Sequence, residues 1–599
     1  MTPRIYPNWE QLNNLKTSLT DGESTLAKFL DDNLPPDWEI YVQPYFNGDR
    51  PDIVLLNPNI GMMIFEIKDW NLDLYRSEKE EKFDKQTKKK IEWYQSYVKD
   101  THGKEQKIPN PIKQIERYRN NLFLYLPELA GAIDTNNNRL AALQIGIYFH
   151  KAPTNQAKTF IPNHEKKHCL VFGFDDLDSN NLKKIVPDCD RGRSAFMNNL
   201  WAENIRFWLK PPYHSIEQGQ PIVLSDEQKR HIQSSPKQHQ RLRGVAGSGK
   251  TLVIAQRAAN LASINKKILV VTFNITLWHH IRDCISRAKY NFSWEQFEFN
   301  HFHGFCKNYL YENDISLPDM DTDTDDFLDI QIPELIIKSL KNGKNKKKRE
   351  YDAILIDEGQ DYCNKYYEML CMFLSENNEV LLVADEKQNI YSRELSWLEN
   401  MQGTQFKGRW RELKQSYRLP SSILKEANRF AATFLPNVGL MPEPIQGELF
   451  NPHFLWRNLD TYFLPLDKLY QAFDWLTKKK SINPSDIVIL LPTHKEGIEA
   501  KQYFENKNIK INDVFEEEKG KKSHKHGFWM GDSRLKMCTI HSFKGWELNN
   551  IIVVTPNSED YPNIDYLMYI AITRTRENLI IFNRTKKYSE YGLNWENKW

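Results

Sequence analysis

The sequence predicts an α/β protein of at least three domains, and three observations support this fold class. At 599 residues the chain exceeds the size that one hydrophobic core supports. A glycine-rich loop at residues 244–251 leads into an apolar helical run, which is typical of a strand–loop–helix unit. Strand-like apolar runs follow this unit at residues 267–273, 351–356 and 380–384.

The first candidate site lies in a predicted β-hairpin, formed by residues 50–56 and 62–68. Period-two alternation places Glu66 and Lys68 on one face of the second strand, and Asp52 arrives from the first. Asp52 and Glu66 could then ligate Mg²⁺ or Mn²⁺, while Lys68 orients or helps deprotonate a water that attacks a phosphodiester. The alternative is an exposed strand face, where Glu and Lys often pair.

The glycine-rich loop at residues 244–251 fits the pattern GxxxxGK[ST]. In such a loop backbone N–H groups surround phosphate, the lysine reaches the β/γ oxygens, and the final hydroxyl binds Mg²⁺. The sequence therefore predicts a nucleoside triphosphate site, and the alternative is a flexible Gly/Ser loop that only resembles the pattern. The predicted nucleotide-binding residues are Gly244, Gly247, Ser248, Gly249, Lys250 and Thr251.

About 100 residues after this loop, the apolar run at residues 351–356 ends in two acids, Asp357 and Glu358. Asp357 is expected to hold Mg²⁺ together with Thr251, and Glu358 to polarise the attacking water. The roles differ because only one carboxylate can face the metal. The alternative is a buried strand with a solvated acidic end.

A series of ordered motifs between residues 224 and 576 resembles the UvrD/Rep-type superfamily 1 helicases. The resemblance covers roughly residues 220–599 and implies two RecA-like domains that use ATP and Mg²⁺. Two departures from the family pattern are Gly359 and Ala384. The motifs occupy residues 224–228, 244–251, 271–274, 302–305, 357–361, 384–391, 415–418, 539–547 and 571–576.

The resemblance also implies roles for individual residues. Gln228 would read the adenine edge, and Gln360 and Gln388 would couple the γ-phosphate to the nucleic acid. Glu547 would lie near the nucleotide, and Arg418 and Arg574 would be arginine fingers, with an ordinary salt-bridged arginine as the alternative. The candidates for nucleic-acid contact are Phe273, Asn274, His303, Tyr391, Trp397, Tyr417 and His541, although most aromatic residues are expected in the core.

The N-terminal region resembles the nuclease-related domain, NERD, over about residues 15–150. Glu23 opens a predicted helix before the hairpin, and Gln114 lies at the start of another helix after it. The resemblance implies that Glu23 and Gln114 are further active-site residues. One departure is the residue before Asp52. The NERD family often has Glu there, whereas this chain has Pro51, as other PD-(D/E)xK nucleases do. The alternative is a degenerate domain that only binds DNA or a partner.

Composition limits the partners and the location. The formal net charge is only +2, so a nucleic-acid-binding face must be local. No 18-residue apolar run or cleavable signal is evident, which favours a cytoplasmic protein without membrane association. The seven cysteines include no CxxC pair and are expected to be reduced in that compartment. The charged stretch at residues 78–90 is expected to be a solvated loop or helix face.

The expected architecture is an N-terminal PD-(D/E)xK-like nuclease domain followed by two RecA-like P-loop domains with a small inserted accessory domain. The resemblance implies that such a fusion translocates on single-stranded DNA, 3′ to 5′, and cuts single- or double-stranded DNA, and it is similar to bacterial nuclease–helicase proteins of anti-phage defence. The alternatives are a repair helicase and an ATPase switch with a non-catalytic N-terminal domain. The expected boundaries are 1–210 (nuclease), 211–221 (linker), 222–395 (first motor domain, with an insertion at about 280–350), 396–430 with 535–599 (second motor domain) and 431–534 (accessory domain).

Overall fold

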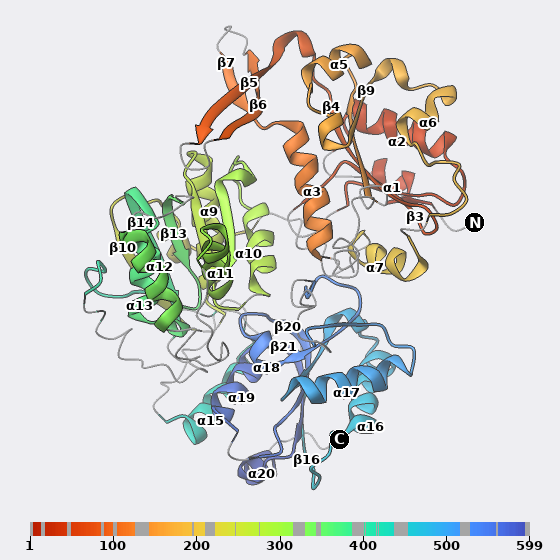
Figure 1. The fold of residues 1–599 in the computed structure, drawn as a ribbon. Coiled ribbons are helices and arrows are strands. Elements are labelled where there is room, and N and C mark those ends of the chain that lie inside the picture. The colour runs from red at the N-terminus through yellow and green to blue at the C-terminus, as the bar shows by residue number, and fades with distance from the viewer. Residues whose placement is uncertain are drawn as a thin grey trace. The chain divides into compact units, whose positions relative to one another are not determined.

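The chain divides near residue 211 into two compact units in the computed structural model (Figure 1). Among the described helices, none has both the length and the apolar character needed to cross a membrane. The described residues are 4–13, 18–44, 49–84, 89–99, 105–125, 143–194, 197–209, 222–245, 247–274, 276–315, 330–342, 349–385, 401, 403–414, 416, 419–436, 453–515, 527–558 and 561–593.

The N-terminal unit is built on a six-stranded mixed sheet. Its strand order is β1 (Ile5–Tyr6), β2 (Glu39–Val42), β3 (Ile53–Asn57), β4 (Gly61–Lys68), β8 (Leu143–Phe149), β9 (Cys169–Gly173). Strands β3 and β4 pair antiparallel, with Ile53 opposite Phe65, so the predicted hairpin is confirmed. Strands β4, β8 and β9 run parallel, which is why β4 is buried on both faces.

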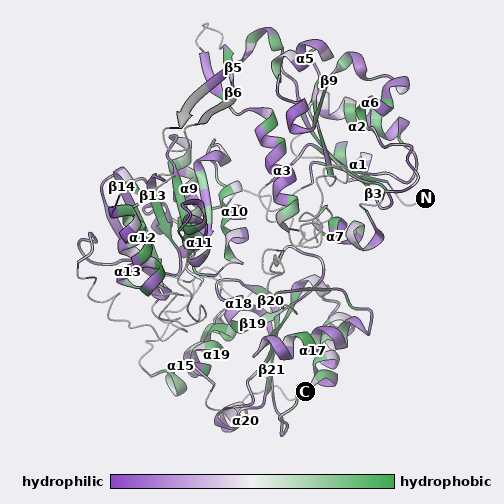
Figure 2. Ribbon diagram, in the orientation of Figure 1, coloured by the Kyte–Doolittle hydropathy of each residue, from purple (hydrophilic) through white to green (hydrophobic). Residues whose placement is uncertain are grey.

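Helices complete this unit. The principal ones are α2 (Asp21–Asn33), α3 (Pro111–Tyr125), α5 (Thr154–Phe160) and α7 (Asn199–Leu209). Leu26, Ala27 and Leu30 of α2 join the hydrophobic core. Figure 2 shows hydrophobic and hydrophilic residues interspersed along these helices, as expected where one helix face is buried.

Residues 78–84 and 89–90 of the charged stretch lie in strands, so for these residues the prediction of a loop or helix face is wrong. A three-stranded antiparallel sheet contains β5 (Tyr75–Asp84), β6 (Lys89–Lys99) and β7 (Glu105–Ile108). Opposite charges face each other across it, as between Arg76 and Glu105 at 2.7 Å. The charged residues did not indicate strands, because strands with polar side chains on an exposed face can still form backbone hydrogen bonds with their neighbours.

The first sheet of the C-terminal unit is entirely parallel. Its order is β12 (Phe297–His301), β11 (Ile268–Thr272), β13 (Tyr351–Ile356), β14 (Leu374–Ala384), β10 (His239–Gly244), β15 (Arg411–Leu413). Successive strand residues enter opposite hydrophobic clusters, as Ile354 and Leu355 do. The accompanying helices are α9 (Lys250–Ser263), α10 (Leu277–Ser286), α11 (Phe302–Glu312), α12 (Ile332–Lys341) and α13 (Asn364–Cys371).

The second sheet of this unit is also parallel. Its order is β16 (Phe454–Asn458), β21 (Thr575–Asn583), β20 (Leu548–Val554), β17 (Ile487–Leu491), β19 (Leu535–Thr539), β18 (Ile511–Asp513). Its helices are α15 (Ser421–Phe434), α16 (Leu466–Asp474), α17 (His494–Glu505), α18 (Ile540–Phe543), α19 (Ile564–Thr573) and α20 (Ser589–Leu593).

Both segments that were predicted to be insertions contribute strands to the two parallel sheets. Strands β16, β17 and β18 lie between residues 431 and 534, yet they share one sheet with β19, β20 and β21. Strand β12, between residues 280 and 350, likewise pairs with β11 in the first sheet. The all-apolar run of β17 has the composition of a central parallel strand, but motif spacing alone did not identify it as part of the motor sheet.

A buried ion pair between α9 and β14 leads to a stability prediction. Arg257 Nη2 lies 2.6 Å from Glu379 Oε1, and both side chains are fully buried. Burial lowers the pKa of Arg257, and Glu379 opposes that shift. Arg257→Met should reduce the free energy of unfolding by about 3–5 kcal/mol, because Glu379 would remain as an uncompensated buried charge.

Urea unfolding of the full chain checks this prediction through the transition of the C-terminal unit. Lys478→Met is the matched control, since it breaks an exposed pair with Asp474 and should change little. Equal midpoints for Arg257→Met and the wild type would contradict the predicted role of the pair.

Candidate active sites

The hairpin and α3 bring four of the predicted N-terminal site residues together. Glu66 Oε1 lies 2.5 Å from Lys68 Nζ and accepts a 2.7 Å hydrogen bond from Gln114 Nε2. Lys68 Nζ also lies 3.5 Å from Gln114 Oε1. Asp52 Oδ2 accepts a hydrogen bond from the backbone N–H of Ile67 at 2.6 Å, which fixes it beside β4.

The electrostatics of this cluster combine burial with opposed charges. Burial raises the pKa of the Asp52 carboxyl well above its ordinary value, and the charge of Glu66 raises it further. Burial alone would lower the pKa of the Lys68 ammonium, but Glu66 and Asp52 outweigh that effect and raise it. Lys68 therefore stays charged, and one cation faces two closely spaced acids.

Glu23 lies at the start of α2 and has a clear structural role. Its Oε2 accepts from the N–H of Thr20 at 2.7 Å, while the Thr20 hydroxyl accepts from the N–H of Glu23, a capping box. Its Oε1 accepts from Gln43 Nε2 at 2.8 Å. The charge of Glu23 nevertheless raises the pKa of Asp52 slightly, so it lies within electrostatic reach of the cluster.

Tyr118 belongs to the cluster but was not predicted as a site residue. Its hydroxyl accepts a 2.9 Å hydrogen bond from Gln114 Nε2, which also donates to Glu66. The four-residue spacing of Gln114 and Tyr118 on a helix was the sequence signal that could have identified it. Tyr118 orients the amide that reaches Glu66.

The donor set of the cluster fits a divalent cation. Glu66 Oε2 is buried and has no hydrogen-bond partner among the described residues, which is costly unless a cation or water completes it. Mg²⁺ commonly binds through one or two carboxylates and keeps waters or substrate phosphates as its other ligands. No group of three or more His, Cys, Asp or Glu side chains suited to a metal occurs in the described ranges. The two acids that this cluster offers to a cation are Asp52 and Glu66.

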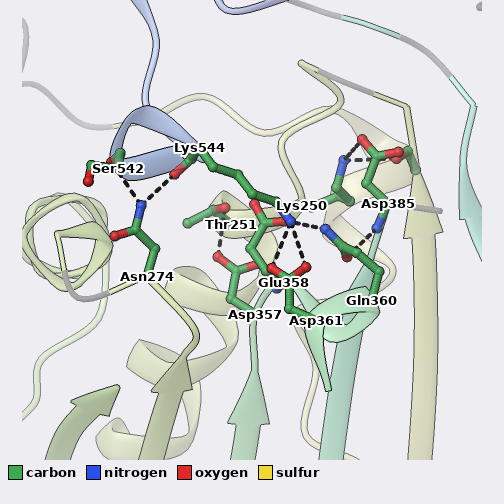
Figure 3. Close-up of polar contacts among 11 residues, drawn as sticks. Lys250, Thr251, Asn274, Asp357, Glu358, Gln360, Asp361, Asp385, Ser542 and Lys544 are labelled. Carbon is green, nitrogen blue, oxygen red and sulfur yellow. Dashed lines mark hydrogen bonds and ion pairs between the residues drawn. The ribbon is translucent and has the colours of Figure 1, made fainter. Parts of the chain in front are cut away.

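The second candidate site is the loop between β10 and α9 (Figure 3). Lys250 Nζ donates to the carbonyls of Gly244 at 2.8 Å and Val245 at 3.0 Å, and lies 3.1 Å from Asp385 Oδ2. Lys250 thus curls back over its own loop, at the N-terminus of α9. Gly247 and Gly249 have φ values of +72° and +83°, a region that favours glycine.

Gln228 approaches this loop from the short helix α8 (Asp226–Lys229). Its Nε2 donates to the carbonyl of Ser248 at 3.0 Å. A Cβ atom at Gly249 would lie only 2.4 Å from Gln228 Nε2, so glycine is also needed for this approach. The structure therefore brings Gln228 and the predicted phosphate loop together.

The two acids after β13 lie directly beside the loop. Asp357 Oδ2 accepts a hydrogen bond from the Thr251 hydroxyl at 2.9 Å. Burial, together with the charge of Glu358, raises the pKa of Asp357 to about 7 against the opposing effect of the hydrogen bond from Thr251. A hydroxyl, a buried acid and a phosphate loop in contact form a donor set that fits Mg²⁺ with a nucleotide.

Glu358 is held in an unusual conformation by its neighbours. Its φ of +54° lies in the left-handed region, which costs about 1–3 kcal/mol for such a residue. Gln360 Nε2 donates to Glu358 Oε2 at 2.5 Å, and Gln360 Oε1 accepts from the N–H of Asp385 at 2.9 Å. Gly359 is explained by packing, since a Cβ atom there would lie 2.6 Å from Leu382 Cδ2.

The loop after β19 contacts the first sheet through a buried lysine that was not predicted as a site residue. Lys544 Nζ lies 2.8 and 2.7 Å from the two carboxylate oxygens of Asp361 and 3.8 Å from Glu358 Oε2. Asn274 Nδ2 donates to the carbonyls of Ser542 and Lys544, each at 2.9 Å (Figure 3). The segment at the end of α18 thereby contacts Asp361, five residues after the end of β13.

Arg574 follows α19 and pairs with Glu547. Arg574 Nη1 lies 3.6 Å from Glu547 Oε1, and Arg576 Nη2 lies 2.9 Å from Glu547 Oε2. The two predicted residues, Arg574 and Glu547, therefore belong to one cluster of ion pairs. Gln388 and Arg418 lie outside the described residues, as do the three predicted contact residues Tyr391, Trp397 and Tyr417.

The other predicted nucleic-acid contacts are partly engaged within the protein. The ring of Phe273 lies 5.5 Å from that of His303 and 6.0 Å from that of Tyr362, both edge to face. The ring of His541 lies 6.5 Å from that of Tyr561. Phe273 is thus held at the end of β11 by aromatic packing.

Comparison with protein families matches two regions of the chain. Residues 18–141 match the nuclease-related domain family, and residues 228–394 match a family described as an AAA domain. The chain therefore joins a nuclease-related domain to an AAA-type domain, which confirms the predicted α/β class and the predicted order of the two kinds of domain.

Parts of the chain are similar to curated proteins that are named as DNA helicases. The chain is 36% identical to the ATP-dependent DNA helicase Rep of Buchnera aphidicola subsp. Acyrthosiphon pisum over 14% of this chain and 12% of that protein. It is 30% identical to DNA helicase II of Haemophilus influenzae over 15% of this chain and 13% of that protein. It is 24% identical to the putative ATP-dependent DNA helicase R568 of Acanthamoeba polyphaga mimivirus over 41% of this chain and 36% of that protein. In each case the chain spans well under half of the relative's length.

Proposed function

We propose that the protein is an ATP-driven DNA motor joined to a metal-dependent nuclease. The observation that carries the proposal is the presence of two separate clusters, each complete in charge and donors for phosphate chemistry. One contains Asp52, Glu66 and Lys68, and the other contains Lys250 and Asp357. The family matches to a nuclease-related domain and an AAA domain support the same assignment.

In the motor, Lys250 would leave the carbonyls of its own loop and contact the β/γ phosphates of ATP. Thr251 and Asp357 would hold Mg²⁺, which neutralises charge on the phosphates. Glu358, oriented by Gln360, would accept a proton from the attacking water. Gln360 also contacts the backbone at Asp385, so a change at the γ-phosphate would reach the end of β14.

The Lys544–Asp361 contact offers a route from ATP to nucleic acid. Lys544 lies in the loop after β19, and Asp361 lies three residues after Glu358. Movement of the acids during hydrolysis would therefore be transmitted to the second sheet. Alternating contact between the two sheets is the motion that a motor needs to advance along a strand.

In the nuclease, Asp52 and Glu66 would hold Mg²⁺ or Mn²⁺, which activates water and stabilises the leaving oxygen when bound. Lys68 stays charged between the two acids and can orient the water or the scissile phosphate. Gln114 holds the Glu66 carboxylate in place, and Tyr118 holds Gln114. Glu23 would act mainly by fixing α2.

We further propose that the motor moves 3′ to 5′ on single-stranded DNA and that the protein acts in the cytoplasm against foreign DNA. The likeness to UvrD/Rep-type motifs supports the direction, and the fusion of nuclease and motor supports destruction of DNA. Repair is the competing role, in which the nuclease would trim rather than degrade.

A cleavage assay on labelled single- and double-stranded DNA, with and without ATP, tests the proposed function. Metal-dependent loss of the strand without ATP is expected, together with DNA-stimulated ATP hydrolysis. ATP hydrolysis with intact DNA under every metal condition would contradict the nuclease assignment. It would support an ATPase switch with a DNA-binding N-terminal domain instead.

Arg574→Ala is expected to leave ATP binding intact and to slow hydrolysis by about 10³-fold, the order that arginine fingers supply. Arg576→Ala is the matched control, because Arg576 pairs with the same Glu547 but is 39% exposed. Measured DNA-stimulated turnover should fall much further for Arg574→Ala. Similar turnover of the two variants would make Arg574 a structural residue.

A further inference from the structure

The connection between β16 and α16 carries two consecutive exposed aromatic side chains. Tyr462 is 74% exposed and Phe463 is 83% exposed. Single exposed apolar residues are ordinary on protein surfaces, but adjacent large rings point to a ligand more strongly. Neither residue belongs to a motif with a role in the proposed ATP site.

The backbone that carries these rings is held firmly. The carbonyl of Tyr462 accepts hydrogen bonds from Asn557 Nδ2 at 3.2 Å and from Arg584 Nη1 at 3.3 Å. Arg584 is buried and its Nη2 lies 2.6 Å from Glu496 Oε1. The N–H of Phe463 donates to the Thr461 hydroxyl at 3.1 Å. The rings are therefore presented to solvent by an ordered turn, so binding would order little further backbone.

The pair lies at the carboxyl edge of the second parallel sheet. The contacts of Tyr462 come from the segments that follow β20 and β21, and Arg584 extends them to the start of α17, which follows β17 (Figure 1). Tyr561 donates to the carbonyl of Pro492 after β17, and its ring lies 6.5 Å from that of His541 after β19. A continuous series of segments thus joins the pair to the predicted contact residue His541.

Ligands of open α/β sheets bind outside the carboxyl ends of the strands. From β19 to β16 there are four inter-strand steps of about 4.8 Å each. This edge is long enough for several nucleotides of a single strand. Five exposed side chains along it are polar or basic and could contact phosphates, namely Thr493, His494, Lys495, Asn557 and Lys586, while Asp460 after β16 is an exposed acid that would face away from a phosphate.

We propose that Tyr462 and Phe463 form a base-stacking platform that binds single-stranded nucleic acid at this edge. The inference rests on the proposed function, because it extends the strand path beyond His541. Stacking needs unpaired bases with free faces, which a single strand offers and a duplex does not. A protein partner would be expected to meet a broad apolar surface, whereas the other exposed residues along this edge, such as Lys495 and Asn557, are polar or charged.

The test measures binding of a fluorescein-labelled oligothymidylate to the full chain by anisotropy, without ATP. Tyr462→Ala with Phe463→Ala is expected to raise Kd about 10-fold or more, the size of one or two lost base stacks. Tyr462→Phe and Phe463→Tyr should restore the wild-type Kd, because they keep the rings. The variants should fold normally, since both side chains are exposed.

Tyr311→Ala is the matched control, because Tyr311 is 86% exposed on α11 of the first sheet. The slope of log Kd against log salt concentration should be the same for the double variant and the wild type, since stacking releases no counterions. A smaller slope would instead indicate a lost phosphate contact and would overturn the stacking role. An equal loss of affinity for a hairpin duplex would also overturn it.

The binding assay distinguishes failure of the stacking platform from failure of the proposed function. Absence of oligothymidylate binding by the wild type would contradict the proposed DNA motor itself. Wild-type binding that the double alanine variant retains at equal Kd would overturn only the platform, and would leave the rings as a surface for another macromolecule.

Discussion

Glu66→Gln is expected to lower the rate of DNA cleavage by about 10³-fold or more, because a metal-bound transition state would lose several kcal/mol of stabilisation. The substitution keeps the shape of the side chain but removes the charge that faces Lys68 Nζ at 2.5 Å. Cleavage of a labelled strand should be measured over a range of Mg²⁺ and Mn²⁺ concentrations. Added metal should not restore the rate.

Glu116→Gln is the control for this variant. Glu116 lies on α3, two residues after Gln114, and contacts Lys167 at 3.3 Å, outside the cluster of Asp52 and Glu66. It should cleave at nearly the wild-type rate. Strong cleavage by folded Glu66→Gln protein would place the active site elsewhere or reveal a contaminating nuclease.

Lys68→Ala separates metal binding from catalysis within the same cluster. Titration of Mn²⁺ should still saturate this variant, whereas its cleavage rate should fall. This contrast would assign Lys68 to the water or phosphate rather than to the metal. Loss of Mn²⁺ binding would instead make Lys68 a structural partner of Glu66.

Lys250→Ala is expected to reduce ATP hydrolysis by about 10³-fold or more, since the β/γ phosphates would lose their direct cation and the transition-state charge would be unopposed. The chain should remain folded, because Lys250 bonds two loop carbonyls and Asp385 and anchors no hydrophobic core. DNA-stimulated phosphate release measures the effect.

Lys266→Ala controls for loss of a lysine in the same domain. Lys266 lies 3.7 Å from Asp352 in a partly exposed pair near the start of β13. It should hydrolyse ATP normally. Near wild-type turnover by Lys250→Ala protein would remove the basis for assigning an ATPase to this loop.

The sequence allowed the local chemistry of both sites to be predicted, because that chemistry is encoded by short motifs. The pattern at residues 244–251 requires Gly249, whose φ is positive, for backbone conformation and Lys250 for charge, so the loop is identifiable without its surroundings. The hairpin that carries Asp52 and Glu66 was equally local, since alternation and a short turn determine it.

Long-range features were not predictable in the same way. The salt bridge of Lys544 with Asp361 joins residues 183 positions apart, and although each residue lies in a motif, neither motif indicates that the two side chains meet. The same limitation affected β16 and β17, whose pairing with β21 and β20 depends on a distant partner. Strand membership of a sheet is a tertiary property, so spacing between motifs assigned these segments to an insertion.

The central claim is that two independent active sites occupy one chain, and it is tested by measuring both activities on the same preparations of Glu66→Gln and Lys250→Ala protein. Glu66→Gln should lose metal-dependent cleavage and keep DNA-stimulated ATP hydrolysis. Lys250→Ala should lose ATP hydrolysis and keep metal-dependent cleavage of a single strand without ATP. Cleavage by Glu66→Gln at the wild-type rate, or hydrolysis by Lys250→Ala at the wild-type rate, would contradict the account.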